Sequence, residues 1–144
     1  RGLTISCAES CTGGGLAYAF TALPGSSTWF KCSAVTYANE AKTQMVGVPE
    51  CTLQQFGAVS EQTVIAMAQG VVEHLHADIG ISISGVAGPD GGSPEKPVGT
   101  VWFGFAFAGE IYASKQCFAG DREAVRKQAI EFAIEKIVQL ITSN

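Results

Sequence analysis

The side chains of Ser10 and Lys42 form the pair best suited to nucleophilic chemistry in this sequence. Ser10 lies in the stretch AESCTGGG (residues 8–15), where a strand pattern stops and a helical pattern begins. A serine attacks at neutral pH only when a base takes its proton, and neither histidine is well placed for that task. Lys42 is the best remaining base, because burial and nearby dipoles lower the pKa of a lysine. Tyr37 could pass or orient the proton between the two.

Each of these residues also has an ordinary structural interpretation. A Ser-x-Thr-Gly-Gly sequence after a strand is more often a helix N-cap or a phosphate cradle, and a lone lysine is usually solvated. Glu9 either fixes the turn or balances a cation. Cys11 competes with Ser10 as nucleophile but lacks a histidine activator. If Ser10 is catalytic, backbone N–H groups of a helix starting near Thr12 would form its oxyanion hole.

Two later segments could bind an anion. The loop at residues 85–99 is rich in glycine and proline, so its backbone N–H groups could form a concave site with Lys96 as counter-charge. Arg122 and Arg126 stand four residues apart at the start of the last predicted helix and face the same side, where they could hold a phosphate. A solvated helix face explains the two arginines equally well.

Hydrophobic periodicity predicts the elements that position these residues. The predicted strands are residues 3–7, 33–37 and 79–84, followed by a hairpin of residues 100–107 and 110–117. The first predicted helix spans residues 16 to about 22, a short second one begins at an Asn39 cap, and residues 52–56 form a single helical turn. Two longer helices run from a Ser60 cap to Leu75 and from an Asp121 cap to Ile141. The core face of the Ser60 helix consists of Val64, Met67, Ala68, Val71, Val72 and Leu75.

This order predicts one α/β domain over residues 1–144, with a mixed sheet covered on both faces. The carboxyl ends of its strands would bring together Ser10, residues 37–42 and residues 84–96. Because the first strand begins almost at residue 1, we expect a helix ahead of this sequence.

Composition narrows the class of protein. Apolar residues make up 47% and charged residues 15%, which is typical of a compact α/β protein. The net charge of -4 and the absence of a basic run argue against nucleic-acid binding. No apolar stretch approaches the roughly 18 residues that span a membrane, and no signal peptide is evident, so we expect a cytoplasmic protein. A homo-oligomer is compatible with these features.

The cysteines and histidines do not form a metal-binding pattern. The five cysteines are scattered without a C-x-x-C pair, which favours free thiols. The only two histidines are two residues apart and would face different sides of a helix. We therefore expect no metal site.

Five separate motifs, in order along almost the whole chain, closely resemble the CinA C-terminal domain family: AESCTGG (8–14), VTYANEAK (35–42), GAVS (57–60), SISGVAGPDGG (82–92) and KPVGTV (96–101). That family includes stand-alone bacterial nicotinamide-nucleotide amidases. The resemblance implies a three-layer α/β/α domain with a mixed, mostly parallel sheet of about five strands including one antiparallel hairpin. It also implies no metal or organic cofactor, and hydrolysis of nicotinamide mononucleotide to nicotinate mononucleotide and ammonia in pyridine nucleotide recycling.

Carried over residue by residue, the resemblance makes Ser10 the nucleophile and Lys42 its base, with Tyr37 assisting. The substrate contacts that it implies are Thr12, Gly13, Ser84, Gly85, Gly88 and Arg126. The rival hypothesis is a non-catalytic nucleotide-binding or partner-binding module linked to competence or DNA-damage responses, as the family name suggests. The acidic charge argues against direct DNA contact, and the intact serine and lysine argue for chemistry.

Overall fold

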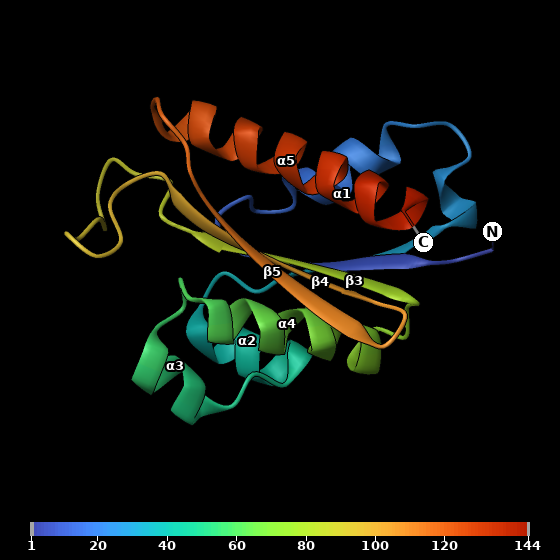
Figure 1. Ribbon diagram of the computed structural model, residues 1–144, viewed down its shortest axis with the longest axis horizontal. Coiled ribbons are helices and arrows are strands. Elements are labelled where there is room, and N and C mark those ends of the chain that lie inside the picture. The colour runs from blue at the N-terminus through green and yellow to red at the C-terminus, as the bar shows by residue number, and fades with distance from the viewer. Residues whose placement is uncertain (1, 144) are drawn as a thin grey trace.

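A five-stranded sheet separates two layers of helices (Figure 1). The computed structural model describes residues 2–143. The strands are β1 (Ile5–Glu9), β2 (Phe30–Val35), β3 (Ile79–Gly85), β4 (Thr100–Phe107) and β5 (Glu110–Cys117). The helices are α1 (Gly15–Thr21), α2 (Asn39–Val46), α3 (Glu50–Phe56), α4 (Glu61–His74) and α5 (Arg122–Thr142), with a 3-10 turn at Ser26–Thr28. Helices α1 and α5 cover one face and α2, α3 and α4 the other, which confirms the three-layer prediction.

The strand order is β2-β1-β3-β4-β5. Strand β1 pairs in parallel with both β2 and β3, whereas β4 is antiparallel to its neighbours β3 and β5. Of the five strands only β4 runs against the others, so the prediction of a mixed, mostly parallel sheet with one hairpin is confirmed. The carboxyl end of β1 therefore lies between two parallel neighbours, at the position where α/β sheets bind ligands.

Alternation along the strands builds a separate core on each face of the sheet. Ile79, Ile81 and Ile83 of β3 pack on the α1 and α5 side, whereas Ser82 faces α4 and donates a 2.6 Å hydrogen bond to the carbonyl of Val64. The second core consists of Ala8, Val46, Val48, Val64, Met67 and Val71. Each fully buried aliphatic side chain of this kind contributes about 1.5–3 kcal/mol.

A glycine on α4 lets α2 approach closely. A Cβ atom at Gly70 would collide with the backbone carbonyl of Val46, the last residue of α2. Helix α2 can therefore pack tightly on α4 and hold its inward side chains, Lys42 and Val46, out of solvent. The position of Lys42 thus depends on this helix contact.

Two of the three predicted helix caps are confirmed. The hydroxyl of Ser60 accepts a hydrogen bond from the N–H of Thr63 at 3.2 Å, and the Asp121 carboxylate accepts one from Ala124 at 2.9 Å. The third was wrong, because Asn39 is the first helical residue of α2 and no side chain caps that helix. The Asn39 amide is therefore available to line a cavity.

Several element boundaries differ from the predicted ones. Strand β1 continues to Glu9, and β2 spans Phe30–Val35 instead of residues 33–37, because Val35 pairs in register with Glu9. Helix α1 begins at Gly15, and the turn at residues 52–56 is the end of the longer helix α3. No helix in the described part of the chain is long and apolar enough to cross a membrane.

Candidate active site

A cavity of about 220 Å³ lies at the carboxyl ends of β1 and β3. Its lining comes from the turn after β1, the start of α2 with the residues just before it, the connection between α3 and α4, the end of β3 with the loop that follows, and the first residue of α5. The lining residues are Ser10, Cys11, Tyr37, Asn39, Lys42, Ala58, Val59, Ser84, Gly85, Ala87 and Arg122. The three segments that were predicted to meet at this edge of the sheet are therefore brought together.

The Lys42 amine contacts the Ser10 hydroxyl inside this cavity. The Nζ–Oγ distance is 3.3 Å, and the two side chains come from α2 and from the turn after β1. The same Nζ donates to the carbonyls of Thr36 at 2.7 Å and Tyr37 at 3.3 Å. Lys42 is 1% exposed and Ser10 8% exposed, so both lie almost out of solvent.

The surroundings of the Lys42 amine make its proton easier to remove. Burial lowers the pKa of Lys42 from its ordinary value of 10.5, and the nearby Cys11 thiol opposes that shift. No carboxylate among residues 2–143 contacts Nζ, whose hydrogen-bond partners are two carbonyls and one hydroxyl. A neutral amine has two N–H groups, which suit the two carbonyls, and one lone pair. That lone pair is then free to accept the proton of Ser10.

The Glu9 carboxylate occupies the N-terminus of α1. Its two oxygens accept hydrogen bonds from the backbone N–H groups of Leu16 and Ala17, at 2.8 and 3.0 Å. The expectation that these helix N–H groups face the substrate was therefore wrong. The N–H groups of Cys11 and Thr12, which directly follow Ser10, donate to no protein oxygen within residues 2–143.

The backbone and the side chain of Tyr37 bind different residues, Lys42 and Arg122. Its carbonyl accepts a hydrogen bond from Lys42, whereas its ring is 60% exposed and its hydroxyl pairs with Nη2 of Arg122 at 3.3 Å. Nη1 of Arg122 donates to the carbonyl of Gly88 at 2.8 Å. The Tyr37 hydroxyl thus positions a guanidinium group at the cavity, and makes no hydrogen bond with Ser10.

The residues implied as substrate contacts divide into two groups. Ser84 and Gly85 line the cavity, as does Arg122, the arginine that the resemblance did not select. Gly88 lines a neighbouring cavity of about 470 Å³, which shares Ala87 and Arg122 with the first.

The other implied contacts, Thr12, Gly13 and Arg126, support the turn. The Thr12 hydroxyl donates to Glu9 at 2.7 Å, and the Gly13 N–H donates to the carbonyl of Ser10 at 3.0 Å. Nη2 of Arg126 donates to the Thr12 carbonyl at 3.3 Å and would lie 3.2 Å from a Cβ atom at Gly13, where φ is +58°. Glycine therefore suits that position for two reasons, the left-handed backbone and the close guanidinium.

The expectation that Lys96 balances an anion in the glycine-rich loop is corrected, and the Cys11 thiol remains the weaker candidate nucleophile. Lys96 donates to the Phe56 carbonyl at 2.8 Å, so its charge lies at the end of α3 and not within the glycine-rich loop. Burial raises the pKa of the Cys11 thiol to about 11, with opposing effects from its own N–H and from Arg126 and Arg122. At neutral pH this thiol stays protonated and is a poor competitor for Ser10.

Four lining residues were missed as site residues. Asn39 was predicted only as a helix cap, and no individual role was predicted for Ala58, Val59 or Ala87. All four lie within motifs of the family resemblance: Asn39 in VTYANEAK, Ala58 and Val59 in GAVS, and Ala87 in SISGVAGPDGG.

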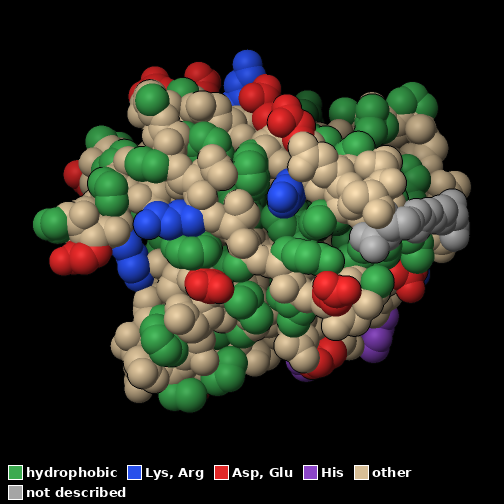
Figure 2. Space-filling view, viewed as in Figure 1, with side chains coloured by type: hydrophobic (Ala, Val, Ile, Leu, Met, Phe, Trp, Pro, Cys, Tyr) green, Lys and Arg blue, Asp and Glu red, His purple; other side chains and the backbone are tan. Residues whose placement is uncertain are grey.

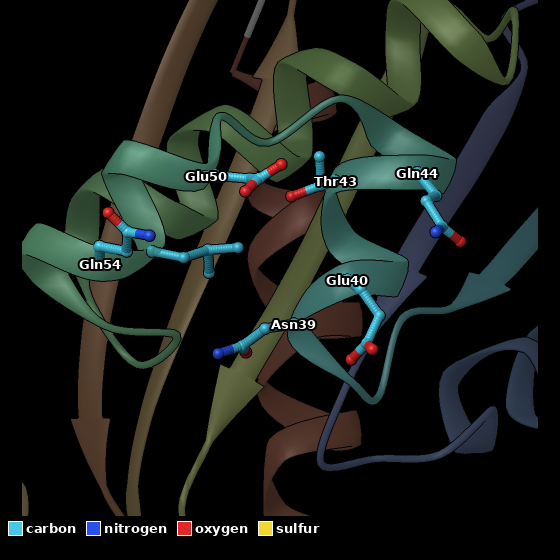
Figure 3. Close-up of a pocket in the computed structure, with 7 residues that line it drawn as sticks. Asn39, Glu40, Thr43, Gln44, Glu50 and Gln54 are labelled. Carbon is cyan, nitrogen blue, oxygen red and sulfur yellow. The ribbon is translucent and has the colours of Figure 1, made fainter.

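A second cavity of about 430 Å³ lies between α2 and α3. Figure 3 shows Glu40, Thr43 and Gln44 of α2 on one side of it and Glu50 and Gln54 of α3 on the other. Asn39 lines this cavity and the first one. The second cavity contains no nucleophile paired with a base, so the first remains the candidate active site.

Residues 2–143 contain no group of three or more His, Cys, Asp or Glu side chains placed to hold a metal ion. All five cysteines are free. On the face in Figure 2, Lys and Arg side chains lie among acidic and apolar ones without forming a continuous basic surface.

Comparison with known proteins agrees with this fold. The family described as CinA C-terminal domain matches residues 1–141. The nicotinamide-nucleotide amidohydrolase PncC of Escherichia coli K12 is 56% identical over 145 residues, covering 100% of this chain and 88% of that protein. The Pseudomonas putida protein of the same name is 49% identical over 138 residues, covering 96% of this chain and 86% of that one.

A solved structure extends the comparison to three dimensions. The crystal structure of a competence-damaged protein (CinA) superfamily protein from Klebsiella pneumoniae 700603 superposes with a TM-score of 0.96 at 41% identity, covering 100% of this chain and 90% of that chain. Sequence motifs, strand order and whole-chain similarity thus agree. The chain belongs to the CinA C-terminal domain family.

Proposed function

We propose that this protein hydrolyses the carboxamide of nicotinamide mononucleotide, giving nicotinate mononucleotide and ammonia in pyridine nucleotide recycling, with Ser10 as nucleophile and Lys42 as base. The observation that carries the mechanism is the buried Lys42 amine, 3.3 Å from the Ser10 hydroxyl and held by two backbone carbonyls. The substrate is proposed by similarity to relatives named for that activity, one of them 56% identical over the whole chain.

In the first half of the reaction, Ser10 Oγ attacks the carboxamide carbon while its proton passes to the neutral Nζ of Lys42. The oxyanion of the tetrahedral intermediate accepts hydrogen bonds from the N–H groups of Cys11 and Thr12. When the intermediate collapses, the Lys42 ammonium returns the proton to the departing nitrogen. Ammonia leaves, and an ester joins Ser10 to the nicotinoyl group.

In the second half, water replaces ammonia. Lys42 takes a proton from a water molecule as that molecule attacks the ester carbon, and then returns the proton to Ser10 Oγ. Nicotinate mononucleotide leaves and the resting enzyme is restored. Every step uses groups of this chain and the substrate, and proton transfer of this kind contributes about 10²–10⁴-fold to rate.

The two adjoining cavities suggest how the substrate lies. The cavity of about 220 Å³ suits the pyridine carboxamide, with Ser84 and Gly85 beside the ring. Gly88 belongs to the neighbouring cavity of about 470 Å³, which would take the ribose. Arg122 lines both and is proposed to hold the phosphate, since its guanidinium is suited to bidentate contact with phosphate oxygens. Thr12, Gly13 and Arg126 would then support the turn from behind.

A cytoplasmic location suits this reaction. A phosphorylated nucleotide does not cross a membrane unaided, so an enzyme that recycles it works where the nucleotide is made. The five free thiols also fit a reducing compartment.

Ammonia release from nicotinamide mononucleotide tests the proposal. We expect release from the wild-type protein and none above background from Ser10→Ala. The matched control is Ser26→Ala, because Ser26 is equally buried, at 8% exposure, but lies on the 3-10 turn away from the cavity. A folded wild type that releases no ammonia, or a Ser10→Ala variant with undiminished release, would exclude the proposed amidase mechanism.

A further inference from the structure

The Glu9 carboxylate touches neither reacting group and yet accepts four hydrogen bonds. Its Oε1 accepts from the Thr12 hydroxyl at 2.7 Å and the Leu16 N–H at 2.8 Å. Its Oε2 accepts from the Ala17 N–H at 3.0 Å and the Ser33 hydroxyl at 2.9 Å. Glu9 is completely buried, so these four donors replace the water that the charge has lost.

The four donors come from three parts of the fold. Thr12 belongs to the turn that follows the nucleophile, Leu16 and Ala17 to the first turn of α1, and Ser33 to β2. One carboxylate therefore ties the turn to a helix and to a neighbouring strand. Since Glu9 directly precedes Ser10, this anchor lies one residue from the attacking oxygen.

The backbone of Glu9 reaches the base as well. Its carbonyl accepts a hydrogen bond from the Thr36 N–H at 2.8 Å, and the Thr36 carbonyl in turn accepts from Nζ of Lys42 at 2.7 Å. The Ser10 N–H is bound to the carbonyl of Ile83 on β3 at 3.0 Å. Nucleophile and base are thus both connected, within two hydrogen bonds, to the residue that carries the buried carboxylate.

We propose that Glu9 is a positioning residue for Ser10. Its carboxylate, through the Thr12 hydroxyl, holds the turn so that Ser10 Oγ faces Lys42 and the N–H groups of Cys11 and Thr12 face the substrate carbonyl. The inference rests on the proposed function for its catalytic consequence. It goes beyond that function by assigning a positioning role to a buried carboxylate that touches no substrate.

A merely structural helix cap would behave differently. Thr12 and Ser33 each donate one hydroxyl hydrogen bond to Glu9, at 2.7 and 2.9 Å, but only Thr12 lies in the turn that carries the nucleophile. If Glu9 only stabilises the fold, losing either hydroxyl should have the same consequence. If Glu9 positions Ser10, the loss at Thr12 should slow the reaction and the loss at Ser33 should not.

The experiment compares Thr12→Val, Thr12→Ser and Ser33→Ala with wild type, using kcat and KM for nicotinamide mononucleotide and the unfolding midpoint. We expect Thr12→Val to lower kcat by about 10–100-fold with KM changed less than about threefold, the pattern of a misplaced reacting group. Thr12→Ser keeps a hydroxyl at this position, so its kcat should be within about threefold of wild type. The kcat of Ser33→Ala should be within about twofold of wild type.

A second readout does not depend on the natural substrate. Diisopropyl fluorophosphate modifies a reactive serine when Oγ forms a bond to phosphorus, fluoride leaves, and the serine proton passes to the base. The rate of this mass increase, followed on the intact protein, should fall in Thr12→Val and not in Ser33→Ala. Ser10→Ala is the control that shows which serine reacts.

The outcomes separate the two proposals. Equal effects of Thr12→Val and Ser33→Ala on kcat and on labelling, or a Thr12→Val defect confined to KM, would overturn the positioning role while leaving the amidase in place. Wild-type protein that releases no ammonia but labels at Ser10 would overturn the amidase, and the labelling rates of the two variants would still decide the role of Glu9.

Discussion

Glu9 and Lys42 are two buried charged residues on opposite faces of the sheet at the end of β1, and their surroundings differ. Glu9 is 0% exposed and receives four hydrogen bonds from N–H and O–H groups, so a negative charge is fully matched. Lys42 is 1% exposed and has two carbonyls and one hydroxyl as partners, with no carboxylate among them. A positive charge there is only partly matched.

This difference assigns the two residues different tasks. A buried group whose charge is matched by surrounding dipoles keeps that charge and holds structure together. A buried amine without a counter-ion gives up its proton more easily, and burial accordingly lowers the pKa of Lys42. Loss of water thus lowers the pKa of Lys42, whereas the Glu9 carboxylate has four hydrogen-bond donors in place of water.

Among substitutions at these two residues, the largest expected effect is the loss of kcat on replacing Lys42. Lys42→Met keeps a long unbranched side chain and removes the base, so kcat should fall by about 10²–10⁴-fold. The unfolding midpoint should not fall, because the variant also removes a poorly matched buried amine. Steady-state kinetics and denaturant unfolding measure both. A rise in KM with unchanged kcat would instead make Lys42 a binding residue.

The stability of the protein should depend on Glu9. Glu9→Gln replaces one acceptor oxygen by a donor that faces hydrogen-bond donors, and each charged hydrogen bond lost costs about 1.5–3 kcal/mol. We expect the free energy of unfolding to fall by about 3 kcal/mol or more, measured by urea titration. If the Glu9→Gln variant unfolds at the same urea concentration as wild type, the four hydrogen bonds do not stabilise a charged carboxylate at this position.

The pH dependence of stability should reveal the lowered pKa of Lys42. Between that pKa and the unfolded value of 10.5, the native lysine binds fewer protons than the unfolded one, so the free energy of unfolding rises with pH. The stability of wild type relative to Lys42→Met should therefore increase as pH rises through this window, and kcat/KM should rise as the amine loses its proton. A difference that stays flat up to pH 10.5 would contradict a lowered pKa.

Arg122 provides a smaller test with an exposed cation. Its guanidinium lies at the cavity with Tyr37 and Gly88 as partners. Arg122→Gln should raise KM for nicotinamide mononucleotide by about tenfold and change kcat little, because a phosphate contact contributes to binding throughout the reaction. The matched control is Lys127→Gln, an exposed cation on the same helix that lines neither adjoining cavity. Equal KM values for the two variants would remove Arg122 from the phosphate site.

The smallest effect is expected at Cys11, which lies beside Ser10. With its pKa raised to about 11 by burial, the thiol remains protonated in the working range. Cys11→Ala should retain kcat within about threefold, and iodoacetamide at neutral pH should modify the exposed Cys51 and Cys117 well before Cys11. Loss of activity on selective alkylation of Cys11 would contradict this assignment.

Sequence patterns predicted the elements better than the contacts between them. Alternation identified β3 and the hairpin almost residue by residue, and Ser60 and Asp121 marked true helix starts. The prediction of Asn39 as a helix cap was wrong because cap-forming residues also occur inside the first turn of a helix. In α2 the cap position is occupied by Ala38, and Asn39 is the first helical residue.

Within the site, Ser10 and Lys42 could be paired from chemistry alone, since few other bases were available. The role of Glu9 could not be decided from sequence. Its partners include Ser33, which is 24 residues away, and backbone N–H groups whose direction depends on where α1 begins. Arg122 and Arg126 were equivalent by spacing, and only the packed helix reveals that Arg122 reaches the cavity while Arg126 binds the turn.

The measurement that tests the central claim most directly is peptide mapping by mass spectrometry after acid quench during turnover of nicotinamide mononucleotide. The account predicts a nicotinate mononucleotide acyl group, linked as an ester, on Ser10 of the wild-type protein and no acyl group in Ser10→Ala. An acyl group on Cys11, or steady ammonia release from Ser10→Ala, would contradict the assignment of Ser10 as the nucleophile activated by Lys42.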